Sequence, residues 1–299
     1  MIPKEILYTM QNYKIITDSC CDLTQQMIEE LEIEVIPLSV VMGNNTYLNY
    51  PDWREISPQD FYGALRNKSM ASTSAINMET FIEAFEKHLE KGEDVLYLAF
   101  SSALSATYNA SVLAAKELAE KYPERKILCS DTLAASMGQG LLVYTVAKNC
   151  KDKTLEEAYN YAESIKQNTV HWFTVDDLGF LHRGGRISSV TAVVGSILSV
   201  KPILHVSEEG KLVSVSKTRG RKNSIKALCD RIAEIALDLE NGTVFISHGD
   251  CEDDAKELEA MLRDKGVKDV VINYIGPVIG AHSGPGTVAV FCMGRDRLV

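Results

Sequence analysis

The first half of the chain alternates between short apolar runs and longer amphipathic segments. The apolar runs have the length of buried strands, whereas apolar residues in the amphipathic segments recur at the spacing of one helix face. Strands are predicted at residues 13–18, 33–41 with a break at Pro37, 95–100 and 126–130. Helices are predicted at 22–31, from Ser57 onward, at 78–91, from about Asn109 onward, at 133–150 and at 155–167. Strands that alternate with helices predict a mainly parallel sheet, with a binding face at the carboxyl ends of its strands.

The pattern changes after about residue 166, where strands and helices no longer alternate regularly. Strands are predicted at 171–175, 202–206, 211–216, 243–248, 270–275 and 287–293, and helices at 223–238 and 253–265. The sequence Glu208-Glu-Gly210 has the composition of a hairpin turn between two of these strands. The segment 190–200 is apolar with small residues, and the Gly- and Pro-rich segment 276–286 is predicted to be a loop.

The length of the chain favours two domains. At 299 residues it is long for a single core, and its 45% of hydrophobic residues suffice to fill two. We expect an α/β protein with a mainly parallel α/β sandwich at residues 1–165 and a mixed α+β domain at residues 166–299.

Charge and cysteine content exclude several classes of protein. A net charge of -10 argues against nucleic acid or an anionic membrane as the main partner. Membrane insertion is not expected because no window reaches the roughly 18 apolar residues of a membrane span. The start of the chain does not resemble a secretion signal, so a cytoplasmic location is expected. The seven cysteines are scattered without a C-x-x-C pair, and we expect neither a metal nor a cofactor.

Hydroxyl side chains gather where the strand 95–100 turns into the following helix. They are Ser101, Ser102, Ser105 and Thr107. Backbone N–H groups and the positive end of the helix dipole converge at such a turn, so it suits a carboxylate or a phosphate. The alternative is that these residues only cap the helix.

Several motifs follow one another in the order found in a known family. They are Ile16-Thr-Asp-Ser, Thr73-Ser, Ser101-Ser-Ala-Leu-Ser-Ala-Thr-Tyr, Phe180-Leu-His-Arg-Gly-Gly-Arg-Ile-Ser, Lys201-Pro-Ile-Leu and Ile275-Gly-Pro-Val-Ile-Gly-Ala-His-Ser-Gly-Pro-Gly-Thr-Val-Ala-Val. With these motifs the sequence resembles the DegV family over nearly its whole length.

The resemblance implies a bacterial protein that binds one long-chain fatty acid, such as palmitate or oleate, in a pocket associated with the domain interface. The protein would catalyse nothing alone. It would present the carboxylate to a separate ATP-binding subunit of a fatty acid kinase, which forms acyl phosphate for phospholipid synthesis. Carried over by position, Thr73 and Ser105 would bond the carboxylate, the backbone of Ala106 would add a donor, His282 would complete the site and Ser74 would be a weaker candidate.

Physical chemistry agrees with such a head-group site. Two hydroxyls, helix-start amides and an imidazole can stabilise a carboxylate without a full positive charge. The sequence departs from the family pattern at Ala106, where glycine is common, and at Ala75-Ile76, where Gln and a small residue or Pro are usual. The selection among fatty acids therefore stays open.

The competing hypothesis is a hydrolase that acts on an acyl ester. Ala103-Leu-Ser-Ala-Thr107 has the outline of a nucleophile elbow, and Ser105, His282 and Asp18 together have the composition of a triad. Bulkier residues replace the glycines of the elbow, which weakens this interpretation. Asp18 and Ser19 could equally hold neighbouring loops through backbone N–H groups.

Two basic segments stand out in an acidic chain, residues 182–186 and 217–222. They are either solvated surface or a docking site for the kinase subunit, because arginine is favoured at interfaces and charge complementarity orients a partner. Arg183 is the first candidate for this contact and Arg219 the second, whereas carboxylates could tie Arg186 into the fold.

Overall fold

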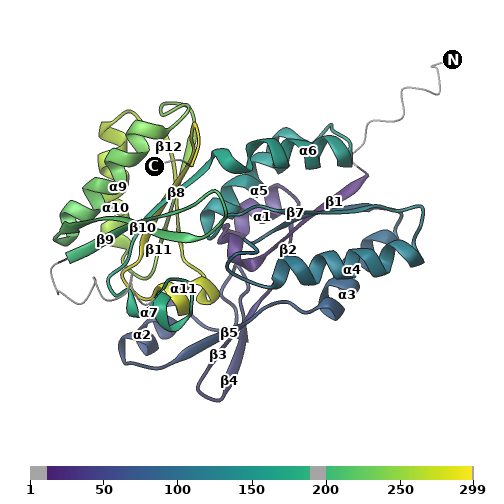
Figure 1. Ribbon diagram of the computed structural model, residues 1–299, viewed down its shortest axis with the longest axis horizontal. Coiled ribbons are helices and arrows are strands. Elements are labelled where there is room, and N and C mark those ends of the chain that lie inside the picture. The colour runs from purple at the N-terminus through teal and green to yellow at the C-terminus, as the bar shows by residue number, and fades with distance from the viewer. Residues whose placement is uncertain (1–11, 189–199, 298–299) are drawn as a thin grey trace.

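The computed structural model describes residues 12–188 and 200–297, which form three sheets with helices packed on their faces (Figure 1). The predicted apolar segment 190–200 lies outside the described residues except for Val200. The α/β fold class is confirmed. It stays a prediction that residues 1–165 and 166–299 are the separate domains.

The first sheet is parallel, as the alternating pattern predicted. Its strand order is β2 (Glu34–Ile36), β1 (Tyr13–Asp18), β6 (Asp94–Ala99) and β7 (Ile127–Asp131). One face is covered by α3 (Met78–Leu89) and α4 (Thr107–Lys121), and the other by α1 (Gln25–Glu30), α5 (Met137–Asn149) and α6 (Leu155–Ile165) (Figure 1). Short 3-10 turns lie at Ser19–Cys21 and Lys166–Asn168. The carboxyl ends of β1 and β6 point toward the centre of the molecule.

The second sheet has six strands and is mostly antiparallel. Its order is β10 (Leu212–Arg219), β9 (Val200–Val206), β8 (Thr169–Thr174), β13 (Val288–Met293), β11 (Thr243–His248) and β12 (Asp269–Tyr274), and only β11 and β12 pair in parallel. Helices α9 (Arg221–Ile235) and α10 (Glu252–Asp264) cover one face. The other face packs on α5, so this helix shares one apolar core with both large sheets.

The third sheet was not predicted. It is antiparallel, in the order β4 (Asn45–Leu48), β3 (Ser39–Met42) and β5 (Ala71–Ser74). The predicted break at Pro37 is confirmed, but the two parts of the predicted strand at 33–41 are separate strands, β2 and β3, that join different sheets. A proline at this place cannot donate to a ladder and suits the passage between sheets.

Several predicted helix starts need correction and one predicted loop is wrong. Helix α1 begins at Gln25 and α5 at Met137, three and four residues after their predicted starts, whereas α4 begins at Thr107, two residues before its predicted start. The predicted loop 276–286 contains α11 (Pro277–Ser283), which has a proline in its first turn and is followed by Gly284 as its C-cap. Two further helices flank α11, namely α2 (Pro58–Arg66) and the short α7 (Gly179–Arg183) (Figure 1).

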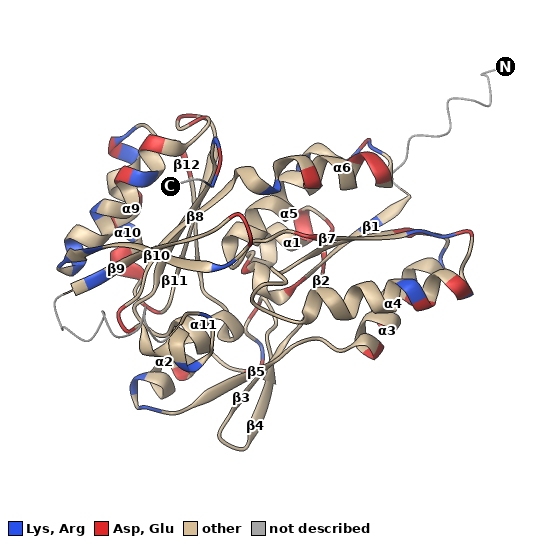
Figure 2. Ribbon diagram, viewed as in Figure 1, with Lys and Arg blue, Asp and Glu red and all other residues tan. Residues whose placement is uncertain are grey.

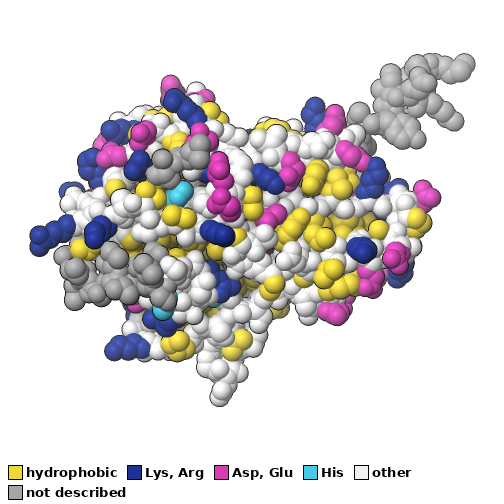
Figure 3. All heavy atoms as spheres, in the orientation of Figure 1, with side chains coloured by type: hydrophobic (Ala, Val, Ile, Leu, Met, Phe, Trp, Pro, Cys, Tyr) yellow, Lys and Arg dark blue, Asp and Glu magenta, His cyan; other side chains and the backbone are white. Residues whose placement is uncertain are grey.

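Charge and apolar surface are unevenly distributed. Lys and Arg gather near β9, β10 and α9 and again near α2 (Figure 2). Hydrophobic side chains are visible over α4 and α6 on the face shown in Figure 3, and Leu113 of α4 is 56% exposed. Within 12–188 and 200–297, none of the helices is long and apolar enough to cross a membrane.

Candidate functional site

An apolar cavity of about 290 Å³ lies where the three sheets approach one another. The second sheet supplies one wall through side chains that alternate along its strands, among them Phe173 of β8, Ala289 and Phe291 of β13. Helix α11 supplies a second wall through Val278 and Ile279. The 3-10 turn at Ser19–Cys21 and loops of the first half add further apolar side chains to the lining, among them Cys20, Leu38, Phe100 and Leu104.

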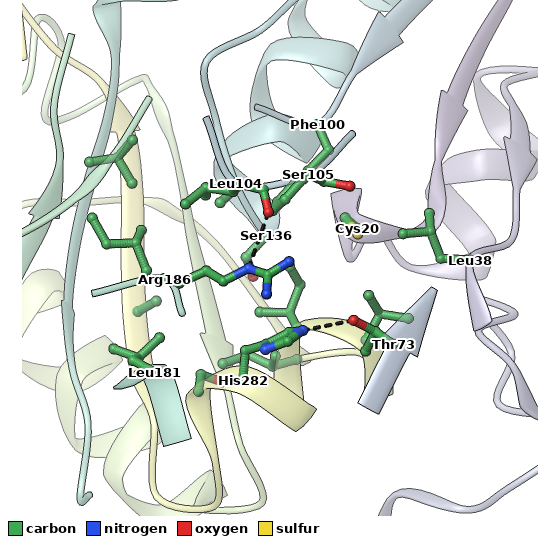
Figure 4. Close-up of a pocket in the computed structure, with 18 of the residues that line it drawn as sticks. Cys20, Leu38, Thr73, Phe100, Leu104, Ser105, Ser136, Leu181, Arg186 and His282 are labelled. Carbon is green, nitrogen blue, oxygen red and sulfur yellow. Dashed lines mark hydrogen bonds between the residues drawn. The ribbon is translucent and has the colours of Figure 1, made fainter. Parts of the chain in front are cut away.

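Polar side chains gather at one end of this cavity (Figure 4). The Nε2 atom of His282 lies 2.8 Å from Oγ1 of Thr73. Arg186 extends toward them from the loop after α7, and its Nε donates to the carbonyl of Leu104 at 3.1 Å. Ser105 lies across Arg186 from His282 and Thr73 (Figure 4), with its Oγ 2.9 Å from Oγ1 of Thr107. Two hydroxyls and an imidazole thus lie around the guanidinium of Arg186 in the cavity lining.

The fold brings these residues together from four distant segments. Thr73 lies on β5, which pairs with β3 through the Thr73–Val40 register. Ser105 and Ala106 precede the first turn of α4, where helix N–H groups have no partner within the helix. His282 lies in the last turn of α11.

Electrostatics at this end of the cavity favour an anion. Burial and the nearby charge of Arg186 lower the pKa of His282 to about 4, so the imidazole is neutral at pH 7. Burial also lowers the pKa of Arg186, which still remains far above neutrality. Among the described residues Arg186 forms no ion pair, and its hydrogen bonds go to the carbonyls of Leu104 and Gly184. Its positive charge is thus available to a carboxylate.

All five residues proposed from the sequence line the cavity, namely Thr73, Ser74, Ser105, Ala106 and His282. Arg186 joins them, and sequence reasoning missed it. The expectation that carboxylates would tie Arg186 into the fold is wrong, because backbone carbonyls hold it instead. The Gly-Gly-Arg sequence does not indicate that Arg186 is partly buried, since the position of Arg186 depends on how α7 packs beside α11.

The four hydroxyls at the start of α4 do not act as one cradle. Ser101 is fully buried and donates to the carbonyl of Gly210 at 2.9 Å, which places it away from the cavity lining. The backbone N–H of Ser102 donates to Asp131. Thr107 begins the helix and contacts Ser105. Only Ser105 of this group reaches the cavity, so the predicted cluster was too broad.

Asp18 has a structural role. Its buried carboxylate accepts hydrogen bonds from the hydroxyl of Tyr97 and from the N–H groups of Phe100 and Cys20. Ser19 likewise accepts the N–H of Leu38. The Asp18 carboxylate therefore does not orient His282, and the hypothetical Ser-His-Asp triad is not assembled.

A larger groove of about 820 Å³ adjoins the polar end of the cavity, and Thr73, Arg186 and His282 line both. The charged side chains of this basic groove are Arg66, Lys68, Arg183, Arg186 and Asp177. Arg183 is exposed and its Cζ lies 4.6 Å from the ring centroid of Phe180. Arg219 is also exposed but lies at the end of β10, outside the groove lining.

His282 packs so closely on the loop after α7 that Gly184 has no room for a side chain. A Cβ atom at Gly184 would lie 2.2 Å from Nδ1 of His282. We therefore expect Gly184→Ala to displace the ring, break its contact with Thr73 and destabilise the fold by about 1–3 kcal/mol, as overpacking does. Ring resonances of His282 in NMR spectra and the melting temperature check this.

Gly63→Ala is a suitable control, because nothing lies within 4 Å of a Cβ atom at that position of α2. The control should leave the His282 resonances unchanged. Unchanged resonances in Gly184→Ala as well would contradict the packing described.

No group of three or more His, Cys, Asp or Glu residues suited to a metal occurs in the part of the chain that the structure describes. The fold and site thus define an α/β protein organised around an apolar cavity with one polar end. This chain belongs to the DegV family, since a family model described as "Uncharacterised protein, DegV family" matches residues 12–295. The resemblance found in the sequence is confirmed.

Relatives of known sequence or structure are similar over nearly their whole length. A DegV domain-containing protein of Clostridium perfringens is 47% identical over 290 residues, which are 96% of this chain and 99% of that protein. A DegV lipid binding protein from Thermotoga maritima is 31% identical, with a TM-score of 0.82 over 96% of this chain and 100% of its own. A fatty-acid-binding DegV family protein from Thermus thermophilus is 28% identical. Its structure matches with a TM-score of 0.85 over 95% of this chain and 99% of its own.

Proposed function

We propose that this protein binds one long-chain fatty acid, with the acyl chain in the cavity and the carboxylate among Thr73, Ser105 and His282. The observation that carries the proposal is the partly buried guanidinium of Arg186, which faces an apolar cavity without a carboxylate partner among the described residues. Fatty acid binding by the Thermus thermophilus relative supports the same ligand class. Ser74 and the backbone N–H of Ala106 are further candidates for head-group contacts.

The acyl chain would provide most of the affinity. Burial of a methylene is worth about 0.8 kcal/mol, so a chain of about sixteen carbons gains on the order of 12 kcal/mol of transfer free energy. A neutral hydrogen bond adds only about 0.5–1.5 kcal/mol. The head group therefore sets the position of the ligand, and the tail sets its retention.

Analysis of the purified protein tests the proposal directly. Mass spectrometry of an organic-solvent extract should reveal one long-chain fatty acid, and calorimetry on delipidated protein should show one site for palmitate or oleate. An extract without fatty acid, together with no heat and no thermal shift on addition of either acid, would refute it. Release of product from a palmitoyl ester would instead favour the hydrolase alternative.

We further propose that a separate ATP-binding kinase subunit phosphorylates the bound acid. A carboxylate oxygen would attack the terminal phosphorus of ATP, forming the acyl–phosphate bond as ADP leaves. The chain has neither a P-loop nor a G-x-G-x-x-G pattern, so the nucleotide site would belong to the partner. The basic groove supports access of a partner to the carboxylate, because Thr73, Arg186 and His282 line both the groove and the cavity.

Thr73→Ala and Ser105→Ala should impair phosphorylation more than fatty acid binding. Each loses a hydrogen bond worth about 0.5–1.5 kcal/mol, and somewhat more because the acceptor is charged. The acyl tail preserves binding, whereas transfer depends on the position of the attacking oxygen. Calorimetry with palmitate and a reconstituted kinase assay measure the two effects separately. Equal phosphorylation by the variants and the parent protein would remove these residues from the site.

Arg183→Ala tests docking at the basic groove. The variant should retain fatty acid and melting temperature, yet form less acyl phosphate, and its remaining activity should depend less on salt because one charge of the encounter surface is gone. Arg263→Ala on α10 is the control, since Arg263 is exposed but pairs with Glu259 away from the groove. Full activity of Arg183→Ala at every ionic strength would disprove the docking role, and Arg219→Ala would then be examined for it.

A further inference from the structure

The N-terminal end of α11 is held by three side chains from the first 66 residues of the chain. The N–H of Gly276 donates to Oδ1 of Asp22 at 2.9 Å, and the N–H of Val278 donates to Oδ1 of Asn49 at 3.3 Å. The hydroxyl of Tyr62 donates to the carbonyl of Ile275 at 2.7 Å. We call Asp22, Asn49 and Tyr62 the α11 clamp.

The α11 clamp is buried and closely packed. Tyr62 is fully buried, and Asp22 and Asn49 are 6% and 3% exposed. A Cβ atom at Gly280 would lie 2.5 Å from the Tyr62 hydroxyl, so α11 contacts α2 at a distance that only glycine permits. None of the three clamp residues lines the cavity. Their contacts therefore fix the helix and not the ligand.

Helix α11 carries the residue that closes the polar end of the cavity. Val278, Ile279 and His282 point from this helix into the cavity lining, and His282 meets Thr73 on β5. A helix of seven residues cannot hold its own position, because so short a helix is marginal without tertiary contacts. The position of His282 relative to Thr73 thus depends on what holds the start of α11.

We propose that Asp22, Asn49 and Tyr62 are positioning residues of the fatty acid site, which hold α11 so that His282 meets Thr73. The inference rests on the proposed function for its ligand, but the geometry of the two side chains is independent of it. Asp22 also accepts a hydrogen bond from Ser136, which lines the cavity at the start of α5. The clamp therefore links two walls of the cavity.

Tyr62→Phe is the sharpest variant, because it removes one hydroxyl and leaves the ring in place. Tyr13→Phe is its matched control: the hydroxyl of Tyr13 donates to the carbonyl of Cys150 at 3.0 Å, in a buried place outside the cavity lining. Both variants lose one buried hydrogen bond to a backbone carbonyl. Their melting temperatures should fall by similar amounts.

The two variants should differ in the site. Tyr62→Phe should shift the His282 ring resonances of the ligand-free protein and weaken palmitate binding roughly three- to tenfold, the range of one hydrogen bond. Tyr13→Phe should leave both unchanged. Asn49→Ala combined with Tyr62→Phe should weaken binding by less than the product of the single effects, since both act through the same helix.

The readouts separate this inference from the proposed function. If the parent protein binds no fatty acid, the proposed function fails. The His282 resonances of Tyr62→Phe and the parent protein still test whether the α11 clamp positions His282. If Tyr62→Phe is folded and its His282 resonances and palmitate affinity match those of the parent protein, the clamp is refuted. The same conclusion holds if Tyr13→Phe changes both to the same extent as Tyr62→Phe.

Discussion

Arg186→Gln is expected to abolish measurable acyl phosphate formation and to weaken fatty acid binding by about 10- to 150-fold. Hydrogen bonds to a charged group contribute about 1.5–3 kcal/mol, and here the guanidinium is the cationic group at the polar end of the cavity. Transfer should suffer more than binding, because the same charge would also face the phosphoryl group entering from the basic groove. Calorimetry with palmitate and the reconstituted kinase assay give the two values.

The ligand-free Arg186→Gln protein should be as stable as the parent protein or more stable. A partly buried guanidinium without a carboxylate partner pays a desolvation cost that glutamine avoids. The pKa of His282 should also rise from about 4 toward its usual value, since the charge of Arg186 contributes to lowering it. Arg183→Gln, which changes an exposed neighbour, should show neither effect. Unaltered affinity in folded Arg186→Gln would exclude Arg186 from the carboxylate site.

The first sheet could be predicted because its strands are largely buried and alternate with amphipathic helices. Strands β1 and β6 are mostly buried along their length, and strands that alternate with helices indicate a parallel sheet. The third sheet gives no such signal. Strand β5 has the sequence Ala-Ser-Thr-Ser, and its extended conformation depends on pairing with β3, which the sequence does not reveal.

Helix α11 likewise could not be predicted from its local sequence. Its glycines and prolines predict a loop, yet Gly280 is the residue that lets the helix approach Tyr62. Pro277 fits the first turn of a helix, where its missing N–H costs nothing. The helix is thus a consequence of tertiary packing, and a prediction from propensity alone could not find it.

Only part of the cavity lining could be predicted, because its other residues are placed by tertiary packing. Motif positions selected Thr73, Ser105 and His282, and all three line the cavity, whereas their binding of a carboxylate stays a prediction. The sequence prediction did not include Arg186, which the loop after α7 brings into the cavity lining. That loop is placed by contacts between α7 and α11, which are far apart in the sequence.

Asp22→Asn is expected to stabilise the protein at neutral and higher pH by up to about 4 kcal/mol. Burial raises the pKa of Asp22 to about 7, well above its usual value of 3.8. The folded state therefore binds a proton more tightly than the unfolded state. Since a shift of one pKa unit corresponds to about 1.4 kcal/mol, the free energy of unfolding should fall by about 4 kcal/mol as the pH rises from about 4 to about 7.

Asparagine preserves the contacts of this position while removing the charge. Its Oδ1 can accept the N–H of Gly276, and its Nδ2 can donate to the hydroxyl of Ser136, so the α11 clamp stays intact. Other titratable groups face the same carboxylate. Asp18 also has a raised pKa and adds to the slope, whereas burial raises the pKa values of Cys20, Cys21 and Tyr62 away from this range.

Chemical denaturation of both proteins at several pH values between 4 and 9 isolates the contribution of Asp22. The two should have similar free energies of unfolding near pH 4, where the carboxyl is protonated, and should diverge up to about pH 7 and then remain parallel. Asp60→Asn is the control, because Asp60 lies exposed on α2 with its carboxylate 2.6 Å from the Ser57 hydroxyl. A constant difference between Asp22→Asn and the parent protein across this range would show that Asp22 does not titrate there, and a less stable variant at pH 8 would show that its negative charge stabilises the fold.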